Sequence, residues 1–372
     1  MWLPFAQETE SRNEGEGREM KVGQSIEQLE TPVAVVDLDR LEANIAGLQA
    51  YLDKHGIASR PHIKTHKIPE IAHMQLNAGA IGITCQKLGE AEVMAQAGIR
   101  DILLPYNILG EAKLERLTYL ARRVSISVTA DSEVTVRGLA GAAQRAGLTL
   151  PVLVECDTGG KRCGVQSPQE AADLARLIAA SPGLHLGGLM TFPIPEGTDA
   201  FVRACKALLG ADGIEVECVS GGGTPQMWQA HTVEELTEHR AGTYVYGDRY
   251  TLRSGAMRLE ECALTVIATV VSRPTAERGI LDGGSKTFSS DPMGEQGYGL
   301  LLEYPEARVY SLSEEHGVVD FSACARKPEV GERVTVLPNH VCPVSNLFNQ
   351  VVGARRGIVE VIWPVAARGM LQ

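Results

Sequence analysis

The sequence lacks a long apolar run, a paired-cysteine motif and an excess of basic residues. No uninterrupted apolar stretch reaches the roughly 20 residues of a membrane-spanning helix, so we predict no contact with a membrane. The formal net charge of −11 argues against nucleic acid as a partner, because phosphate binding requires a basic surface. None of the eight cysteines forms a Cys-x-x-Cys pair and most lie in apolar runs, which predicts reduced thiols and a cytoplasmic protein.

The N-terminal segment lacks the basic start and apolar core of a signal peptide. Its acidic, glycine-containing composition is typical of a disordered leader, and we expect residues 1–27 to be flexible. A further hypothesis is that Met20 is the true start. Sequencing the N-terminus of the native protein tests this hypothesis, because a peptide covering residues 2–15 would contradict it.

From about residue 31 the sequence alternates between short β-branched runs and longer segments with helical spacing of apolar residues. Helices are expected at 39–56, with Gly56 as the C-terminal stop, at 87–98, and at 167–183, with Ser167 as N-cap and Pro168 first. The expected strands of this part are 32–38, 59–65, 80–86, 101–106, 124–130, 150–156, 184–192, 214–221 and 241–248.

This alternation predicts an α/β fold, a parallel (β/α)8 barrel over residues 28–252, with a doubly wound open sheet as the alternative. From residue 253 the pattern changes to strands joined by turns, at 261–274, 278–285, 315–323, 331–341 and 357–367. Residues 253–372 are therefore predicted to form a second domain, which is all β. In a barrel, chemistry lies where the strands end and the loops begin.

The stretch "RPHIKTHK" (60–67) falls at the end of the second expected strand. Alternation along an extended chain places His62, Lys64 and His66 on one side. A lysine at the mouth of a barrel is placed to form a Schiff base, since partial burial lowers the pKa of its amine. The alternative is an ordinary surface lysine.

Two glycine-rich loops are further candidates. "SGGGT" (220–224) follows the eighth expected strand, and its backbone N–H groups could hold a phosphate, although a glycine run also suits a flexible turn. "DTGGKRCGV" (157–165) follows the sixth, and it places Arg162 at the barrel mouth, where a guanidinium binds a phenolic oxygen or a carboxylate. The alternative for Arg162 is a solvated side chain.

In the β domain, "PNHVCPVSN" (338–346) contains His340 and Cys342 two residues apart, so on an extended chain both side chains face the same way. An imidazole and a thiolate suit zinc or a similar divalent ion, with positions left open for water or substrate. The alternative is two buried neighbours without a metal.

Taken together, these motifs resemble the D-threonine aldolase and D-serine dehydratase family, which are metal-activated pyridoxal phosphate enzymes of the alanine racemase fold. The matching segments run in family order over roughly residues 30–370: "TPVAVVDLDRLEAN" (31–44), "RPHIKTHK" (60–67), "GITCQKLGEAEVM" (82–94), "VECDTGGKRCGV" (154–165), "SGGGT" (220–224), "AGTYVYGD" (241–248), "DGGSK" (282–286), "EEHGVV" (314–319) and "PNHVCPVSN" (338–346).

The resemblance implies a role for each motif. Lys64 would carry the cofactor and act as the base at the substrate α-carbon, with His62 close to it. The metal, manganese or zinc, would be bound by His340 and Cys342. The remaining cofactor contacts would come from Gln86, Arg162, Gly221, Gly222, Gly223, Thr224 and Tyr244. The protein is expected to be a homodimer whose substrates are D-3-hydroxy amino acids, cleaved to glycine and an aldehyde.

The sequence also departs from the family pattern. Aldolases of this family typically carry His-x-Asp at the metal site and dehydratases His-x-Cys, so a D-serine or 3-hydroxy-D-aspartate dehydratase is the main alternative. After the seventh expected strand, "TFPIPEG" (191–197) replaces an aromatic-His-Gly turn, with Phe192 where a tyrosine is usual. A racemase is disfavoured because no tyrosine base is evident in the β domain. A non-catalytic cofactor carrier would not need that domain.

Overall fold

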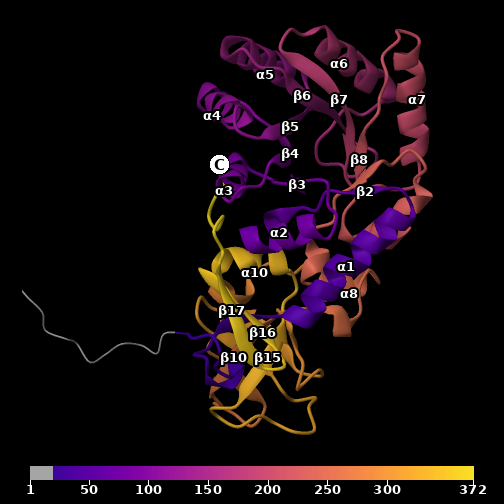
Figure 1. The fold of residues 1–372 in the computed structure, drawn as a ribbon. Coiled ribbons are helices and arrows are strands. Elements are labelled where there is room, and N and C mark those ends of the chain that lie inside the picture. Colours follow the sequence, from indigo (N-terminus) through magenta and orange to yellow (C-terminus); the bar gives the residue numbers. More distant parts are fainter. Residues whose placement is uncertain (1–19) are drawn as a thin grey trace, which may run out of the picture.

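The computed structural model describes residues 20–372, which form two lobes, one above the other (Figure 1). Residues 1–19, most of the predicted leader and all of the peptide that would test Met20 as the start, lie outside the described residues. Residues 20–27 are not a flexible leader. Gly23 N–H donates to Val359 O at 2.8 Å and Ser25 forms a bridge with Ile358, so this segment packs on the smaller lobe.

The larger lobe is a parallel sheet of eight strands within the described part of the chain. Its order is β2-β9-β8-β7-β6-β5-β4-β3. The strands are β2 (Ala58–Ser59), β3 (Ile83–Thr84), β4 (Asp101–Asn107), β5 (Ser125–Ala130), β6 (Leu150–Cys156), β7 (Leu184–Thr191), β8 (Val219–Gly221) and β9 (Glu238–His239). The two edges meet, because His62 bridges Thr84 and Ile81 N–H donates to Ser59 O at 2.9 Å. The predicted barrel is thereby confirmed.

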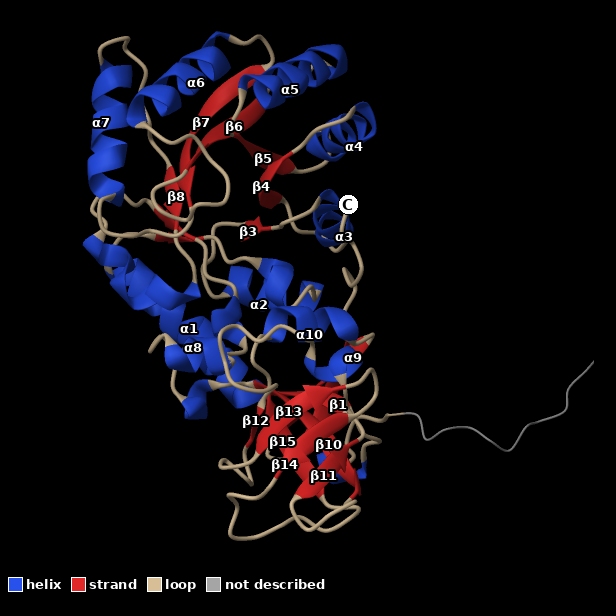
Figure 2. Cartoon of the chain, turned by 180° about the vertical axis from the view of Figure 1, so that it is seen from behind, coloured by secondary structure: helices blue, strands red, loops and turns tan. Residues whose placement is uncertain are grey.

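Helices surround this barrel (Figure 2). They are α1 (Leu38–Lys54), α2 (Pro69–Asn77), α3 (Leu88–Gln96), α4 (Glu111–Ala121), α5 (Glu133–Ala146), α6 (Pro168–Ala180), α7 (Thr198–Gly210) and the short α8 (Arg249–Arg253). The predicted start of α6 is confirmed, since Ser167 Oγ accepts the N–H of Glu170 at 3.2 Å. Gly56 lies just beyond α1 in the left-handed conformation, at φ +67°, which glycine adopts without strain.

The smaller lobe contains a nine-stranded sheet in the described residues. Its strands are β1 (Val33–Asp37), β10 (Leu264–Ser272), β11 (Arg278–Leu281), β12 (Leu300–Leu301), β13 (Arg308–Leu312), β14 (Gly317–Asp320), β15 (Arg333–Leu337), β16 (Gln350–Arg355) and β17 (Ile358–Pro364). Two short helices complete it, α9 (Ser285–Phe288) and α10 (Val341–Leu347). This domain is therefore mostly rather than purely β.

Strand β1 corrects the predicted domain boundary. It pairs antiparallel with β10 and parallel with β16, so it belongs to the β domain and is not the first barrel strand. The run "VAVVD" is buried on both faces. A strand buried on both faces has the same apolar sequence pattern in a barrel as in the centre of another sheet, so the pattern does not distinguish the two. The barrel lobe begins with α1.

Two other expected strands are wrong. The segment 59–65 contains only the end of β2 and then a 3₁₀ turn, Ile63–Thr65, while 241–248 contains a 3₁₀ turn at Thr243–Val245. The last barrel strand, β9, lies just before the second of these segments. Strands of two residues are too short to leave a periodic pattern, so the motifs that follow them look like strands themselves.

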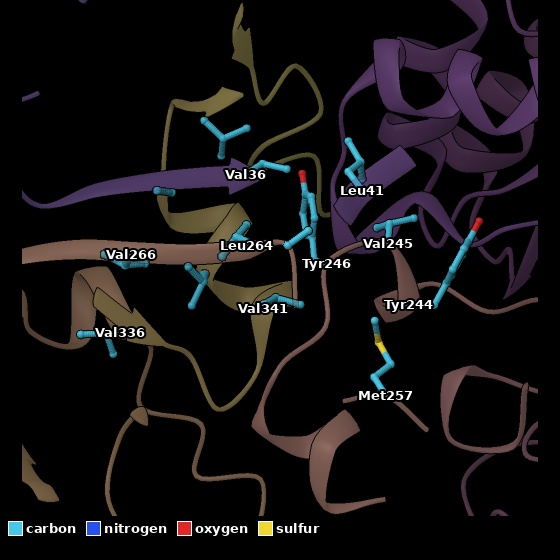
Figure 3. Packing of buried hydrophobic residues seen from close by; sticks show 14 of the residues in the cluster. Val36, Leu41, Tyr244, Val245, Tyr246, Met257, Leu264, Val266, Val336 and Val341 are labelled. Carbon is cyan, nitrogen blue, oxygen red and sulfur yellow. The ribbon is translucent and has the colours of Figure 1, made fainter. Parts of the chain in front are cut away.

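A shared hydrophobic core joins the two lobes (Figure 3). Val36 of β1, Leu41 of α1, Tyr246, Leu264 of β10 and Val341 of α10 are all buried in one cluster. Burying each valine or leucine side chain stabilises the fold by about 1.5–3 kcal/mol. Because the cluster draws on both lobes, this packing fixes the helix that carries Cys342 against the barrel.

The C-terminal segment returns from the β domain to the barrel (Figure 1). Ala367 N–H donates to Lys67 O at 3.1 Å, and Gly89 N–H on α3 donates to the carbonyl of Gln372 at 2.9 Å. The last residues of the predicted β domain therefore lie against the barrel. Within residues 20–372, no helix has the length and apolar character to cross a membrane.

Candidate active site

A cavity of about 240 Å³ lies where the C-terminal ends of the barrel strands face the β domain. Nine of the predicted site residues line it. The barrel contributes seven and the β domain two: His62, Lys64, Gln86, Arg162, Gly222, Gly223 and Thr224, with His340 and Cys342. Gly221 and Tyr244 do not line it. The cavity therefore gathers most of the motifs that the sequence separates.

Lys64 occupies the middle of the 3₁₀ turn that follows the first barrel strand, β2. Burial lowers the pKa of its amine, and the nearby guanidinium groups of Arg162 and Arg240 lower it further, whereas Cys342 opposes the shift. A lysine with a lowered pKa is a better nucleophile near neutral pH. The turn, rather than an extended strand, points Lys64 and Thr65 toward the cavity, whereas His66 is fully buried elsewhere.

His62 holds Gln86 beside the lysine. His62 Nε2 lies 3.0 Å from Gln86 Oε1, and Gln86 Nε2 donates to Pro105 O at 3.3 Å. Burial and the charge of Lys64 hold the pKa of His62 well below its ordinary value, so its imidazole is neutral at physiological pH. A neutral imidazole adds no positive charge beside the amine of Lys64.

The triple-glycine loop follows β8, the seventh barrel strand. Gly222 has φ +81°, and a Cβ there would lie 2.2 Å from the ring of His239. A Cβ on Gly223 would lie 2.7 Å from the ring of Phe192. Only glycine fits either position, so the backbone of this loop reaches the cavity unshielded. Gly221 is the last residue of β8 and lies beneath the loop.

Tyr244 contributes its backbone, not its ring. Its N–H donates to Thr224 Oγ1 at 3.1 Å, while its hydroxyl accepts a hydrogen bond from Gln75 Nε2 at 2.9 Å. The ring is buried in the core between the lobes. Tyr244 therefore supports the loop from below.

Arg162 lies at the mouth of the cavity with its guanidinium 5.0 Å from the centre of the Phe192 ring. Within residues 20–372 no carboxylate forms a salt bridge with it. Phe192, from the turn that departs from the family pattern, thus forms one wall of the cavity and a platform for Arg162.

The predicted metal pair is assembled at the start of α10. His340 is the N-cap residue, with extended backbone, and Cys342 lies in the first turn of the helix, so the two side chains meet without the extended chain that the sequence suggested. Their hydrogen bond raises the pKa of His340 to about 9 against the opposing effect of burial, and Asp291 adds to this shift. Burial raises the pKa of the Cys342 thiol, but His340 and Lys64 outweigh it and lower this pKa.

Cys342 also contacts the barrel directly. Its Sγ lies 3.2 Å from Thr65 Oγ1, the neighbour of Lys64, and 3.8 Å from Thr243 Oγ1. The residues 20–372 contain no cluster of three or more His, Cys, Asp or Glu side chains placed to hold a metal. A metal held here would therefore have His340 and Cys342 as protein ligands, with its other coordination positions open.

The sequence interpretation missed Arg240 and Asp291. Arg240 is 5% exposed, lines the cavity, and donates to Ser220 Oγ and, at 3.0 Å, to Thr191 O. Burial lowers its pKa to about 10. Its position directly before "AGTYVYGD" could have indicated it. Asp291 Oδ2 lies 2.7 Å from His340 Nδ1, and no sequence signal connects two residues so far apart.

A buried ion pair ties α10 to the residues beside Lys64. Lys67 Nζ lies 3.2 Å from Glu90 Oε1, with side chains 6% and 2% exposed, and it donates to Asn346 Oδ1 of α10 at 3.0 Å. Glu90 in turn accepts the N–H of Gln86 at 2.7 Å.

We predict that Lys67→Met destabilises the protein by about 3–5 kcal/mol, because it leaves the Glu90 carboxylate buried without a partner. Denaturant unfolding followed by circular dichroism measures this loss. The matched control is Lys286→Met, which breaks an exposed pair with Glu315 and should leave the unfolding midpoint unchanged. An equal, small effect of both variants would contradict the prediction.

Comparison with known proteins identifies the family. Residues 36–250 match the family described as "Alanine racemase, N-terminal domain", and residues 263–354 match "Putative serine dehydratase domain". A D-threonine aldolase of Arthrobacter sp is 36% identical in an alignment 363 residues long, which covers 93% of this chain and 95% of that protein. A D-threo-3-hydroxyaspartate dehydratase of Delftia sp. (strain HT23) is 32% identical, over 86% of this chain and 93% of that protein.

A solved structure agrees. The crystal structure of D-threonine aldolase from Filomicrobium marinum superposes with a TM-score of 0.86 at 32% sequence identity, covering 95% of this chain and 100% of that one. The chain therefore belongs to the D-threonine aldolase and D-serine dehydratase family, pyridoxal-phosphate-dependent lyases with the alanine racemase fold. The resemblance inferred from the motifs is confirmed.

The cavity residues fit the cofactor of this family. The amine of Lys64 has a lowered pKa, the backbone of Gly222 and Gly223 is bare, and the loop faces the same cavity as two guanidinium groups. A reactive amine and an anion-binding loop are what an aldehyde with a phosphate group requires. The imidazole and thiolate of His340 and Cys342 fit a divalent ion of the zinc type.

Proposed function

We propose that this protein is a lyase that cleaves D-3-hydroxy amino acids, converting D-threonine to glycine and acetaldehyde. The observation that carries this proposal is that one cavity is lined by both Lys64 and the His340–Cys342 pair, and that Oγ1 of Thr65, the neighbour of Lys64, lies 3.2 Å from Cys342 Sγ. In this proposal Lys64 of the barrel and the His340–Cys342 pair of the β domain act on neighbouring atoms of the same small substrate.

In this proposal Lys64 holds pyridoxal phosphate covalently, and the backbone of Gly222 and Gly223 with the Thr224 hydroxyl holds the phosphate. When bound, the cofactor supplies an electron sink that allows a bond at the substrate α-carbon to break heterolytically. His340 and Cys342 would hold a zinc or manganese ion, which would supply Lewis acidity for the β-hydroxyl of the substrate. Arg162 binds a substrate carboxylate or the phenolic oxygen of the cofactor.

The proton bookkeeping follows from these positions. Cleavage between the α- and β-carbons releases the hydroxyl proton to solvent and frees the aldehyde, and the α-carbon then gains one proton, so the proton count is unchanged overall. Lys64 is placed to deliver the proton to the α-carbon, since it lines the cavity and burial lowers the pKa of its amine, which makes the proton easier to release. His62 stays hydrogen-bonded to Gln86 and is neutral, so it places no second positive charge beside Lys64.

The second candidate is dehydration to a 2-oxo acid and ammonia, and the His-x-Cys donor pair favours it. Here Lys64 removes the α-proton and the hydroxyl leaves. Both candidates use the same residues. We propose a homodimer on the family resemblance, and a cytoplasmic location because all eight cysteines are free. Size-exclusion chromatography with light scattering reports the mass of the assembly.

Product analysis separates the two reactions. The protein, incubated with pyridoxal phosphate, manganese or zinc and D-threonine, is expected to yield glycine and acetaldehyde in equal amounts. The 2-oxobutyrate and ammonia of the dehydratase reaction are quantified in the same sample. If these products dominate, the aldolase assignment is wrong and the dehydratase assignment replaces it.

A further inference from the structure

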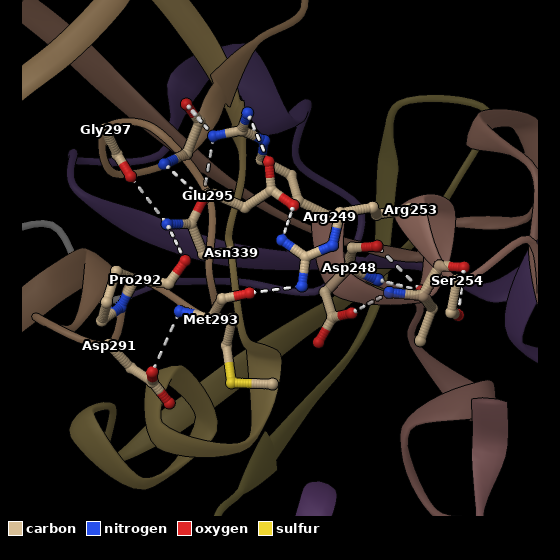
Figure 4. Close-up of polar contacts among 12 residues, drawn as sticks. Asp248, Arg249, Arg253, Ser254, Asp291, Pro292, Met293, Glu295, Gly297 and Asn339 are labelled. Carbon is tan, nitrogen blue, oxygen red and sulfur yellow. Dashed lines mark hydrogen bonds and ion pairs between the residues drawn. The ribbon is translucent and has the colours of Figure 1, made fainter.

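A loop of the β domain, residues 289–299, covers the metal pair and reaches the cavity. We name it the metal-side loop. Asn339, which precedes His340 and is 2% exposed, anchors it by donating to Pro292 O and to Gly297 O and by accepting the N–H of Gly299 at 2.9 Å (Figure 4). Because Asn339 directly precedes His340, these hydrogen bonds fix the position of the loop relative to the His340–Cys342 pair.

The carboxylates of the metal-side loop are already paired. Glu295 forms salt bridges of 3.0 Å with Arg249 and 2.7 Å with Arg253, and Asp291 holds His340 Nδ1 at 2.7 Å. Arg253 also donates to Met293 O at 2.6 Å, which secures the backbone between the two acids. The residue that the loop gives to the cavity is Met293, whose side chain extends away from the anchored backbone (Figure 4).

The part of the wall that this loop contributes is therefore apolar, while the hydroxyl groups of Thr65, Thr243 and Tyr250 also line the cavity. A methionine side chain offers a flexible thioether and no hydrogen-bond donor. Phe192 and Pro105 also line the cavity. A methyl group or another uncharged substituent on the substrate β-carbon can be buried against such a wall, whereas a carboxylate would lose its hydration without compensation.

Most positively charged side chains of the cavity already have a partner or a proposed role. Among the described residues that line it, Lys64 and His340 serve the cofactor and the metal, and Arg240 is bonded to Ser220 and Thr191. His62 is neutral. Arg162 remains, and of its two proposed partners we assign it here to the α-carboxylate that every amino acid substrate carries. Among the side chains that line the cavity, none then offers a free cation to a second carboxylate, as in 3-hydroxyaspartate.

We infer that Met293 determines specificity and that the substrates are D-3-hydroxy amino acids with an uncharged, apolar substituent on the β-carbon. This inference rests on the proposed function and narrows its substrate class. It sets this chain apart from relatives named for 3-hydroxyaspartate.

The test compares kcat/KM for D-threonine and D-threo-3-hydroxyaspartate in the holoenzyme, with both products of each reaction quantified. We expect the wild type to prefer D-threonine by at least about tenfold, because an unpaired carboxylate is costly to desolvate. Met293→Arg adds a cation at the wall and should shift the ratio toward the dicarboxylate by about tenfold or more. Met370→Arg, the same change at an exposed methionine outside the cavity, should leave the ratio unchanged.

A binding measurement separates recognition from chemistry. D-2-aminobutyrate and D-aspartate lack the β-hydroxyl, and their titration into the holoenzyme is followed by the absorbance of the cofactor. The wild type should bind D-2-aminobutyrate more tightly, and Met293→Arg should reverse that order. If Met293→Arg does not fold, Met293→Ala provides the test, since a shorter side chain should raise kcat/KM for D-phenylserine relative to D-threonine.

The outcomes are distinguishable. A wild type that cleaves 3-hydroxyaspartate as well as or better than D-threonine overturns the inference and leaves the lyase function intact. The same holds if Met293→Arg and Met370→Arg have equal ratios, or if Met293→Ala does not favour the larger substituent. A wild type that turns over neither amino acid overturns the proposed function, and the inference falls with it.

Discussion

Lys64→Ala is expected to lower turnover of D-threonine by at least about 10³-fold, because it removes both the group that holds the cofactor and the proton donor to the α-carbon. The absorbance band near the visible edge that marks the covalently held cofactor should vanish in the same variant. Lys64 lies in a tight turn and forms no salt bridge among the described residues, so the fold should remain intact. Product assays, absorbance and a melting curve on one preparation check all three expectations.

Two comparisons make the Lys64 experiment specific. Lys54→Ala removes an exposed lysine in the last turn of α1, outside the cavity, and should leave turnover and the band unchanged. Lys64→Arg keeps the positive charge but cannot form the bond, so it should behave like Lys64→Ala. If Lys64→Ala retains both the band and wild-type turnover, another amine holds the cofactor and the assignment of this site is wrong.

His340→Ala is expected to remove most of the bound metal and to reduce turnover by about 10²-fold or more, since one of two protein ligands is lost. Metal content after dialysis and the dissociation constant for zinc or manganese are measured next to kcat. Asp291→Asn should be milder, with a metal affinity weaker by about 10–100-fold, because Asp291 orients His340 without touching the metal position.

The control for the metal experiment is His316→Ala, which removes an exposed histidine of the same domain. It should bind metal and turn over substrate as the wild type does. High concentrations of metal should partly restore Asp291→Asn but not His340→Ala, because only the former retains both donors. Unchanged metal content and turnover in His340→Ala would show that the His340–Cys342 pair is not a metal site.

The sequence predicts the long elements well, and it selects residues that the fold brings to one cavity. The helix over 39–56 is α1, and Ser167 starts α6 as expected, since apolar periodicity and capping chemistry are local properties. Lys64 and Cys342 were selected by their motifs, and both line the cavity.

The remaining features depend on contacts between distant segments. The short strands β2 and β9 exist only because neighbouring strands pair with them, so no local pattern marks them. The helix α10 was read as extended chain, although its start is fixed by Asp248, whose carboxylate accepts the N–H of Val341 at 3.1 Å from across the domain junction. The partnership of Asp291 with His340 is likewise a product of the fold.

The placement of β1 has a consequence for dissecting this protein. Strand β1 lies between β10 and β16. A single cut after residue 252 would therefore remove a central strand from the sheet of the C-terminal fragment. The N-terminal fragment would keep β1 without either of its pairing partners. Each fragment would also expose its half of the common core. Cys342 and Lys64 thus line one cavity in a chain whose two halves are not separable modules. We expect that neither half can be expressed alone or exchanged with that of a relative.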